Sequence, residues 1–311
     1  MNILVTGGDG FIGSHISRML VKNHHKVSVF TIKYERNLLT DIEDEIQIYE
    51  GNITDKDRIK EVIEKEMPEV IIHLAAFGIG DYGVAKSVEL DPETAFSVNV
   101  TGTYYLYELA VENNVKQMIV SGSTTVYPTK DKINLETIDE SVSLAASNLY
   151  GLTKQMVEKI ADYFSMHHQL PTWSLRLPLV YGPGRWYRGA GGFLVDMIVS
   201  AYNGHTETIK GNEDPIDLMY VKDIAYLIED ILDNSLESTG VVNVKSHTTT
   251  IPEMVQIINR LVEEDLLNFE RSNYMPSYPL IMTDFADEAL SFKSRYTVEE
   301  ACKDFLGEMK K

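Results

Sequence analysis

The chain has 311 residues, of which 44% are hydrophobic and 24% are charged, and these proportions are ordinary for a globular protein. Its 28 Lys and Arg residues stand against 47 Asp and Glu, a formal net charge of -19. Because a surface that negative repels phosphate backbones and anionic membranes, we expect neither nucleic acid nor a membrane as a partner.

The single cysteine, Cys302, excludes an internal disulfide and any multi-cysteine metal site. The eight histidines are scattered or paired in surface-like settings, and we predict no metal. No apolar stretch approaches the roughly 18 residues that span a bilayer. The first strand begins at Asn2 without a leading basic run, so we expect a cytoplasmic protein.

Strands and helices are predicted to alternate up to residue 177. The strands are predicted at 3–5, 26–30, 46–49, 70–74, 117–120 and 172–177, and the helices at 11–20, 55–65, 95–112 and 149–166. This alternation indicates right-handed crossovers and a parallel sheet covered by helices on both faces. The predicted fold class is therefore α/β, a doubly wound parallel sheet of the Rossmann type.

Glycine and proline interrupt this pattern after residue 177. A loop-rich stretch precedes a helix near 193–202, residues 217–232 and 241–244 are expected to return to the sheet, and the tail 251–311 is expected to be helical with polar linkers. We predict a dinucleotide-binding domain and a smaller, mostly C-terminal substrate-binding domain. The first comprises residues 1–177 and about 216–245, and the second about 178–215 and 246–311.

Gly7, Gly10 and Gly13 lie between the first strand and the first helix. Glycine permits the tight turn, the close approach of a pyrophosphate to the backbone and the close packing of helix on strand. The free N–H groups and the dipole at the helix N-terminus favour an anion. The loop therefore predicts a dinucleotide site.

Tyr150 and Lys154 are four residues apart at the start of a predicted helix, so their side chains lie on one face. A phenol of ordinary pKa about 10 must become more acidic to exchange protons near neutrality, and a nearby ammonium favours the phenolate. Ser123 follows the strand that ends at Val120, at the edge of the sheet where ligands bind. These three residues form a candidate proton-transfer set.

Further motifs follow in the same order along the chain: His73-Leu-Ala-Ala76, Asn99-Val-Thr-Gly-Thr103, Arg176 with Val180-Tyr-Gly-Pro183, and Tyr220-Val-Lys-Asp223. With the glycine loop and the proton-transfer set, the chain resembles the extended short-chain dehydrogenase/reductase family, the sugar-nucleotide epimerases and dehydratases. The resemblance covers nearly the whole chain.

The resemblance implies that Tyr150 is the acid/base, that Ser123 hydrogen-bonds the same substrate oxygen, and that Lys154 holds the nicotinamide ribose and lowers the tyrosine pKa. It implies a homodimer through helices at about 95–112 and 149–166. The implied cofactor-binding residues are Gly7, Gly10, Phe11, Ile12, Gly13, Thr31, Lys33, Arg36, Asn52, Ile53, Leu74, Ala75, Ala76, Asn99, Ser121, Tyr150 and Lys154. The implied substrate-binding residues are Phe77, Ser123, Thr124, Thr125, Leu179, Arg185 and Arg188.

The chain departs from the family pattern at the end of the second strand, where the family offers a carboxylate to the adenosine ribose. Thr31 stands there, with Lys33 and Arg36 close behind. Removing a carboxylate and adding cations is what a 2′-phosphate requires, so the cofactor is NAD or NADP with a lean to NADP. The alternative is that these are loop residues that face water.

Two further departures concern the substrate. The family's dehydratases carry Asp-Glu after the catalytic hydroxyl, whereas this chain has Thr124 and Thr125, which disfavours a 4,6-dehydratase. Leu179 and Ile216 replace an Asn and an Arg that lie near the nucleotide diphosphate in the family. Either Arg185 and Arg188 take over that contact, or the substrate has no diphosphate there.

The leading hypothesis is an NAD(P)-dependent epimerase or 4-ketoreductase that transfers hydride at a ring carbon of a nucleotide sugar. A second is a reductase or dehydrogenase of a small carbonyl compound without a nucleotide. A third is a non-catalytic NADP-binding sensor.

Overall fold

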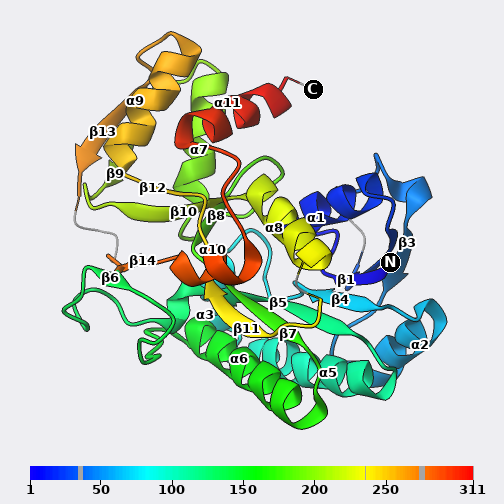
Figure 1. Cartoon of the computed structure of the whole chain (residues 1–311). Coiled ribbons are helices and arrows are strands. Elements are labelled where there is room, and N and C mark those ends of the chain that lie inside the picture. The colour runs from blue at the N-terminus through cyan, green and yellow to red at the C-terminus, as the bar shows by residue number, and fades with distance from the viewer. Residues whose placement is uncertain (34–37, 235, 273–276, 311) are drawn as a thin grey trace.

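The computed structural model describes residues 1–33, 38–234, 236–272 and 277–310 (Figure 1). Its centre is a seven-stranded sheet in the order β11-β7-β5-β4-β1-β2-β3, and every neighbouring pair is parallel. The strands are β1 (Asn2–Thr6), β2 (Lys26–Thr31), β3 (Gln47–Glu50), β4 (Val70–His73), β5 (Gln117–Ser123), β7 (Thr172–Leu177) and β11 (Gly240–Asn243). The predicted doubly wound α/β fold is confirmed.

Side chains alternate between the two faces of this sheet, as the pleat of a strand requires. Ile3 and Val5 belong to the apolar cluster under α1 (Phe11–Lys22), α8 (Val221–Asn234) and α10 (Asp284–Leu290). Leu4 belongs to the opposite cluster, under α2 (Lys56–Glu66), α5 (Gly102–Glu112) and α6 (Leu149–His168). Figure 1 shows the two groups of helices on the two sides of the sheet. The sheet is thus buried on both faces.

The predicted helix at 95–112 is built from three segments, α4 (Pro92–Phe96), a π-helical turn (Ser97–Thr101) and α5. Asp91 caps α4 by accepting the Thr94 N–H at 3.1 Å. The short helix α3 (Val84–Leu90) precedes it. A π-turn adds one residue to a helical turn and changes the direction of the side chains around it, and here that turn contains Asn99.

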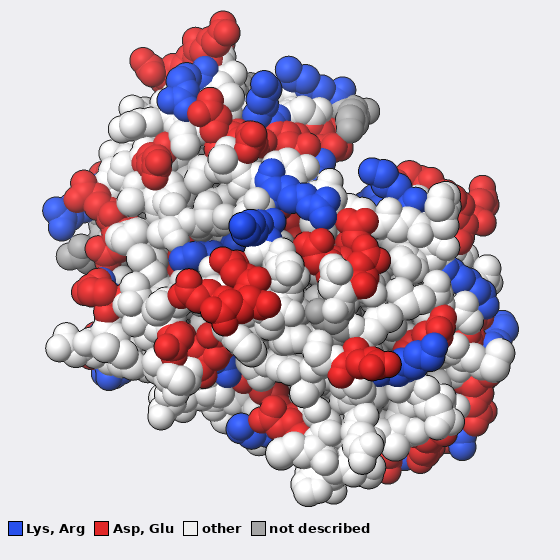
Figure 2. Space-filling view, viewed as in Figure 1, with Lys and Arg blue, Asp and Glu red and all other residues white. Residues whose placement is uncertain are grey.

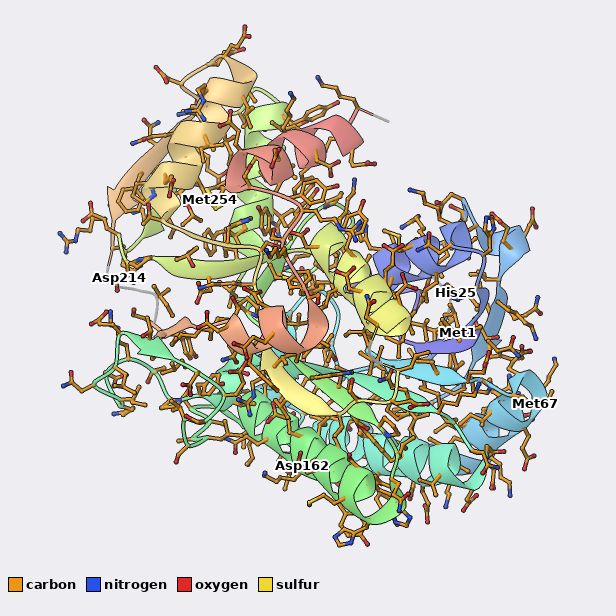
Figure 3. All side chains as sticks on the ribbon, viewed as in Figure 1. Met1, His25, Met67, Asp162, Asp214 and Met254 are labelled. Atoms are coloured by element: carbon orange, nitrogen blue, oxygen red, sulfur yellow. The ribbon has the colours of Figure 1, made fainter. Side chains whose placement is uncertain are left out.

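A second body lies beyond the carboxyl ends of the strands and is drawn at the upper left of Figure 1. It contains α7 (Gly192–Tyr202), α9 (Ile251–Val262) and α11 (Val298–Glu308), with a three-stranded sheet β12-β10-β8 and a parallel pair β13-β9. The strands are β8 (Leu179–Tyr181), β9 (Glu207–Gly211), β10 (Ile216–Tyr220), β12 (His247–Thr249) and β13 (Leu267–Arg271). Met254 of α9 is fully buried in its apolar cluster (Figure 3).

The structure differs from the expected return to the large sheet over 217–232. Residues 216–220 form β10, which pairs with β8 and β12 in the small sheet, and the return begins only with α8 and ends with β11 beside β7. The tail 251–311 contains two strands besides its helices, β13 and β14 (Leu280–Ile281), and β14 pairs with β6 (Thr137–Ile138). The division into two domains at the stated boundaries stays a prediction.

Candidate active site

The glycine loop makes backbone contacts that leave no room for a Cβ at Gly7 or Gly13. Gly7 has φ +70 and donates its N–H to Phe30 O at 2.8 Å. A Cβ on Gly13 would lie 2.2 Å from Gly7 O. Gly10 caps α1 in an extended conformation without a side-chain bond, and the first turn of α1 carries no acidic residue. The first amides of a helix have no intrahelical partner, so this end of α1 suits a pyrophosphate.

Ser123 and Tyr150 are brought together by the start of α6. Asn148 caps this helix by accepting the Gly151 N–H at 2.8 Å. A Cβ on Gly151 would lie 2.3 Å from the carbonyl oxygen of Thr125. Glycine at this position therefore lets α6 begin directly against the turn that follows Ser123.

The Ser123 hydroxyl oxygen accepts two hydrogen bonds, from Thr125 N at 3.2 Å and from Thr125 Oγ1 at 2.9 Å. Both acceptor positions of a hydroxyl are then filled. Its proton is left to donate, and a hydrogen bond from Ser123 lowers the pKa of Tyr150.

Burial nevertheless raises the pKa of Tyr150 above its ordinary value, and the nearby Tyr187 phenol adds to this rise. The Lys154 ammonium lies 5.8 Å from the centre of the Tyr150 ring. It donates to Ser121 O at 2.7 Å and to Ser121 Oγ at 3.2 Å. Burial lowers the pKa of Lys154 to about 8, against the opposing charge of Glu158. The predicted effect of Lys154 on the acidity of Tyr150 stays a prediction.

His73 connects the ends of β1 and β4 to the middle helix. Its Nδ1 lies 2.7 Å from Thr6 Oγ1 and its Nε2 lies 2.8 Å from Thr103 Oγ1. Thr103 Oγ1 donates its only proton to Asn99 O at 2.6 Å, so it can only accept a hydrogen bond from His73. The imidazole proton is therefore on Nε2. Burial, and to a smaller extent the positive charge of Lys154, lower the pKa of His73 to about 3, so the ring is neutral at pH 7. These contacts tie the end of β4 to β1 and to α5.

Asn99 joins the loop after β4 to the first turn of α6. Its Oδ1 accepts the Phe77 N–H at 2.8 Å, and its Nδ2 donates to Thr153 Oγ1 at 3.2 Å. Thr153 in turn donates to Tyr150 O at 2.8 Å. The motif containing Asn99 and Thr103 was visible in the sequence, but the part played by Thr153 was not, since a threonine inside a helix gives no signal of its partner.

The other predicted cofactor residues follow the ends of β2, β3 and β4. Thr31 ends β2, is 5% exposed, and pairs in register with Glu50 of β3. Lys33 is exposed, and Arg36 lies outside the described residues. Asn52 and Ile53 follow β3, and Ile53 packs on Gly102. Leu74, Ala75 and Ala76 follow β4, and the Ala75 N–H points to Thr6 Oγ1 at 3.4 Å.

Three of the predicted substrate residues, together with Ile216, make contacts within the protein. Leu179 and Ile216 pack on the apolar cluster of α7, α9 and α11. Arg185 donates to the backbone at Val180 O (2.7 Å) and Arg188 O (3.0 Å). Arg188 is exposed and pairs with Asp196 of α7. Both cations are therefore engaged within the protein.

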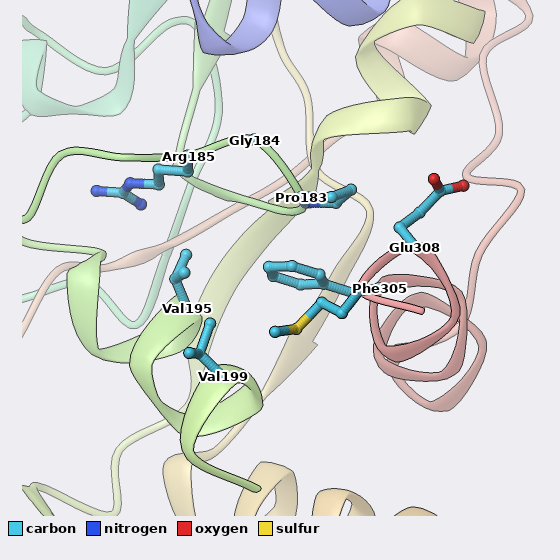
Figure 4. Close-up of a pocket in the computed structure, with 8 residues that line it drawn as sticks. Pro183, Gly184, Arg185, Val195, Val199, Phe305 and Glu308 are labelled. Carbon is cyan, nitrogen blue, oxygen red and sulfur yellow. The ribbon is translucent and has the colours of Figure 1, made fainter. Parts of the chain in front are cut away.

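A pocket of about 270 Å³ lies between α7, α11 and the segment Pro183–Arg185. Its lining is mostly apolar, with Glu308 at its edge. Figure 4 shows the Arg185 guanidinium turned away from the Phe305 ring and from Glu308. Ser123, Tyr150 and Lys154 do not line this pocket, so it is separate from the candidate proton-transfer set.

Acidic side chains occur over much of the face seen in Figure 2, with basic side chains between them. Within the described part of the chain, no helix combines the length and the apolar character needed to cross a bilayer. No cluster of three or more His, Cys, Asp or Glu side chains that could hold a metal ion occurs among the same residues.

Comparison with known proteins gives one family. The model of the NAD dependent epimerase/dehydratase family matches residues 3–244. A UDP-glucose 4-epimerase of Bacillus subtilis is 28% identical over 98% of this chain and 95% of that enzyme. Protein CapI of Staphylococcus aureus is 30% identical over 73% of this chain and 68% of its own length. A bifunctional UDP-glucose and UDP-xylose 4-epimerase of Pisum sativum is 32% identical, and there the match spans about half (52%) of the relative.

Solved structures give the same fold at low identity. A UDP-glucose 4-epimerase of Thermotoga maritima, solved with UDP-glucose, aligns with TM-score 0.85 and 24% identity over 100% of this chain and 99% of that one. An L-threonine dehydrogenase of Clostridium difficile aligns with TM-score 0.86 and 20% identity over 99% of this chain and 97% of that one. One architecture thus serves substrates with and without a nucleotide.

Proposed function

Because the chain belongs to the NAD-dependent epimerase/dehydratase family, we propose that it transfers hydride reversibly at a ring carbon of a nucleotide sugar, as a 4-epimerase or a 4-ketoreductase. The main support for this proposal is that Ser123, Tyr150 and Lys154 lie near one another at the carboxyl end of β5, in a chain whose glycine loop is intact. Full-length similarity to a UDP-glucose 4-epimerase supports the same substrate class.

The residues present fit a nicotinamide dinucleotide. The N-terminus of α1 would receive the pyrophosphate, where a Cβ on Gly7 would meet the Ala75 backbone at 3.0 Å. Lys154 and Ser121 would hold the nicotinamide ribose. When bound, the nicotinamide accepts or supplies the hydride, and its positive oxidised form favours the Tyr150 phenolate.

The protein's own groups handle the proton. Ser123 has one proton to donate, since both of its acceptor positions are taken by Thr125, and it would pass this hydrogen bond from Tyr150 to the substrate oxygen when substrate binds. Tyr150 removes the proton from the substrate hydroxyl during oxidation and returns it to the alkoxide during reduction. Asn148 and Gly151 fix the helix start that aims the phenol.

A 4,6-dehydratase needs a second acid/base pair next to Ser123. The residues there are Thr124 and Thr125, in a 3-10 turn, and Thr125 is already bonded to Ser123. A threonine hydroxyl cannot exchange protons near neutral pH as a carboxyl group can. The geometry thus favours epimerisation or reduction over dehydration.

The test is Tyr150→Phe, assayed for interconversion of UDP-glucose and UDP-galactose and for reduction of 4-keto sugar nucleotides. Loss of the acid/base lowers kcat by about 10²–10⁴-fold. Tyr202→Phe, an exposed position at the end of α7, is the matched control and keeps the wild-type rate. Wild-type turnover by Tyr150→Phe contradicts the assigned role, and a wild type without either reaction contradicts the proposed substrate.

A second candidate is reduction or oxidation of a small carbonyl compound without a nucleotide. It is favoured by the apolar packing of Leu179 and Ile216, where the family has polar contacts to a diphosphate, and by the internal engagement of Arg185 and Arg188. Thermal unfolding with UDP distinguishes the two. A nucleotide-sugar enzyme is stabilised by millimolar UDP, and the second candidate is not.

We also propose that the dinucleotide carries a 2′-phosphate. Thr31 is buried at the end of β2 and offers no carboxylate to the ribose, and the exposed Lys33 follows two residues later. A cation there attracts a phosphate and a carboxylate would repel it. The opposing group is Glu50, at the exposed end of the neighbouring β3.

The proposed partner is a second copy of the chain, bound across the outer face of the middle helices. Large apolar side chains are exposed there: Tyr104 (42%), Leu152 (37%), Met156 (38%) and Tyr163 (51%). A depression of about 660 Å³ on the same face is lined by Val100, Ser143, Leu144, Leu152, Gln155, Met156, Lys159 and Ile160. A patch of this kind marks an interface, and the family resemblance indicates the second copy.

A further inference from the structure

The loop of residues 184–191, named here the crossing loop, connects β8 to α7 and packs against a segment about 100 residues earlier in the chain. The Arg188 N–H donates to Asp81 O at 2.7 Å. A Cβ on Gly189 would lie 2.7 Å from the Cα of Gly83, and Gly189 has φ +73. The crossing loop is therefore held against the segment that follows β4.

Arg185 stabilises the conformation of the crossing loop through hydrogen bonds to backbone carbonyls. Its guanidinium donates to Val180 O and Arg188 O, at 2.7 Å and 3.0 Å, and lies 4.6 Å from the centre of the Tyr187 ring. A Cβ on Gly191 would lie 2.4 Å from Arg185 Nη1, so glycine there makes room for this arrangement. These contacts fix the position of Tyr187.

Tyr187 is the residue that the crossing loop presents to the active site. Its ring packs edge-on against Phe11, the first residue of α1, with 6.2 Å between ring centres, and against Trp186 at 5.5 Å. Phe11 belongs to the helix start that would receive the pyrophosphate. The Tyr187 phenol also raises the pKa of the buried Tyr150, so the two residues belong to the same region of the protein.

We propose that Tyr187 is a further active-site residue, whose ring covers the dinucleotide at the start of α1 and whose hydroxyl contacts the substrate beside Tyr150, with Arg185 as the positioning residue. The hydroxyl part rests on the proposed function, whereas the ring part depends only on dinucleotide binding. Burial raises the pKa of Tyr187, and the Arg185 charge opposes this, so the phenol is protonated at neutral pH and can donate a hydrogen bond to a sugar hydroxyl or a keto oxygen.

Two variants separate the ring from the hydroxyl. Tyr187→Ala removes the aromatic cover and speeds NADH or NADPH dissociation from the holoenzyme, followed by stopped-flow fluorescence, by about tenfold. Tyr187→Phe keeps the ring contacts, so it leaves dissociation at the wild-type rate and lowers kcat for UDP-glucose by about tenfold. Tyr202→Phe and Tyr202→Ala are the matched controls on α7, and they change neither measurement.

Arg185→Met tests the positioning role. It removes the two donors to the backbone while keeping an apolar stem, so it reproduces the faster dissociation of Tyr187→Ala although Tyr187 is present. Dissociation at the wild-type rate from Tyr187→Ala overturns the inference. If the wild type does not turn over UDP-glucose, the proposed function fails, and the dissociation rates still decide the role of the ring. If the wild type is active, an unchanged kcat for Tyr187→Phe overturns the role of the hydroxyl.

Discussion

Gly151 is in direct contact with the carbonyl oxygen of Thr125, which a Cβ at position 151 would approach to 2.3 Å. That oxygen belongs to the backbone of a short 3-10 turn directly after Ser123 and cannot rotate away. The first turn of α6 and the turn after β5 are thus fitted to one another, and this contact sets the separation of Tyr150 and Ser123.

Gly151→Ala is therefore expected to shift the start of α6 and to lower kcat by about 100-fold, since a misplacement of about 1 Å costs that much. The measurement is steady-state turnover of UDP-glucose with thermal unfolding alongside. Gly307→Ala in α11 is the control, because nothing lies within 4 Å of the Cβ it adds. Equal kcat values for both variants would show that α6 absorbs the clash elsewhere.

Lys154 is expected to make the stability of the cofactor-free protein rise with pH. Its pKa is about 8 in the folded protein and 10.5 ordinarily, so between these values the unfolded chain binds the proton and the folded one does not. Relative to Lys154→Met, the wild type gains at most about 3 kcal/mol over this window. Urea unfolding of both proteins from pH 7 to 10.5 measures the difference, and a constant difference would contradict the prediction.

For the ion pair of Arg176 and Glu158, removing one partner is expected to destabilise the fold more than removing both. The guanidinium donates twice to the carboxylate, at 2.9 Å and 2.8 Å, with side chains 5% and 2% exposed. Glu158→Leu leaves the arginine charge buried and destabilises the fold by about 3–5 kcal/mol. Adding Arg176→Met recovers much of this loss. Denaturant unfolding of the single and double variants measures these free energies of unfolding. Losses of stability that simply add in the double variant would show that the two residues are not coupled.

Cofactor choice is expected to follow Thr31 and Lys33. Thr31→Asp places a carboxylate where the 2′-phosphate would lie and lowers the affinity for NADP at least tenfold relative to NAD, since repulsion replaces a charge-assisted hydrogen bond. Lys33→Ala lowers the affinity for NADP and leaves the affinity for NAD unchanged. Fluorescence titration with both reduced dinucleotides measures the ratio. A wild type that binds NAD more tightly would reject the 2′-phosphate, and Glu50→Gln would then identify the ribose-binding carboxylate.

Dimer formation is expected to depend on the apolar face of α6. Leu152→Asp with Met156→Asp places two charges in that face and yields a monomer, because burying unpaired carboxylates is too costly. Light scattering after size exclusion measures the mass. Met282→Asp is the control, since this methionine is 41% exposed directly after β14 and does not line the depression. A wild-type monomer would refute the dimer.

Periodic patterns located the long elements of the sheet, but not the short ones. Strands of two or three residues, such as β6 and β12, are too short to show an alternation. β5 runs on to Ser123 because its pairing with β7 continues through Leu177, which no pattern within residues 117–123 reveals. Likewise, residues 217–232 are expected from the sequence to return to the large sheet, but only tertiary structure decides that β10 joins β8 and β12 instead.

The site was predictable where spacing fixes geometry. Four residues of helix place Tyr150 and Lys154 on one face, and the ends of parallel strands place Ser123 near them. The contact of Lys154 with Ser121 and the approach of Tyr187 to Tyr150 depend on how separate segments fold together. The same holds for Arg185, whose charge suggested a ligand and whose donors bind the backbone.

The π-helical turn at Ser97–Thr101 makes the contacts of Asn99 depend on the number of residues in this segment. Deleting Val98 would turn this segment into a regular α-helix, in which each residue advances the side chains by about 100°. The Asn99 amide would then swing away from Phe77 and Thr153 without any change in its chemistry. Natural variation in this segment is accordingly expected to keep its length constant even where its residues are replaced.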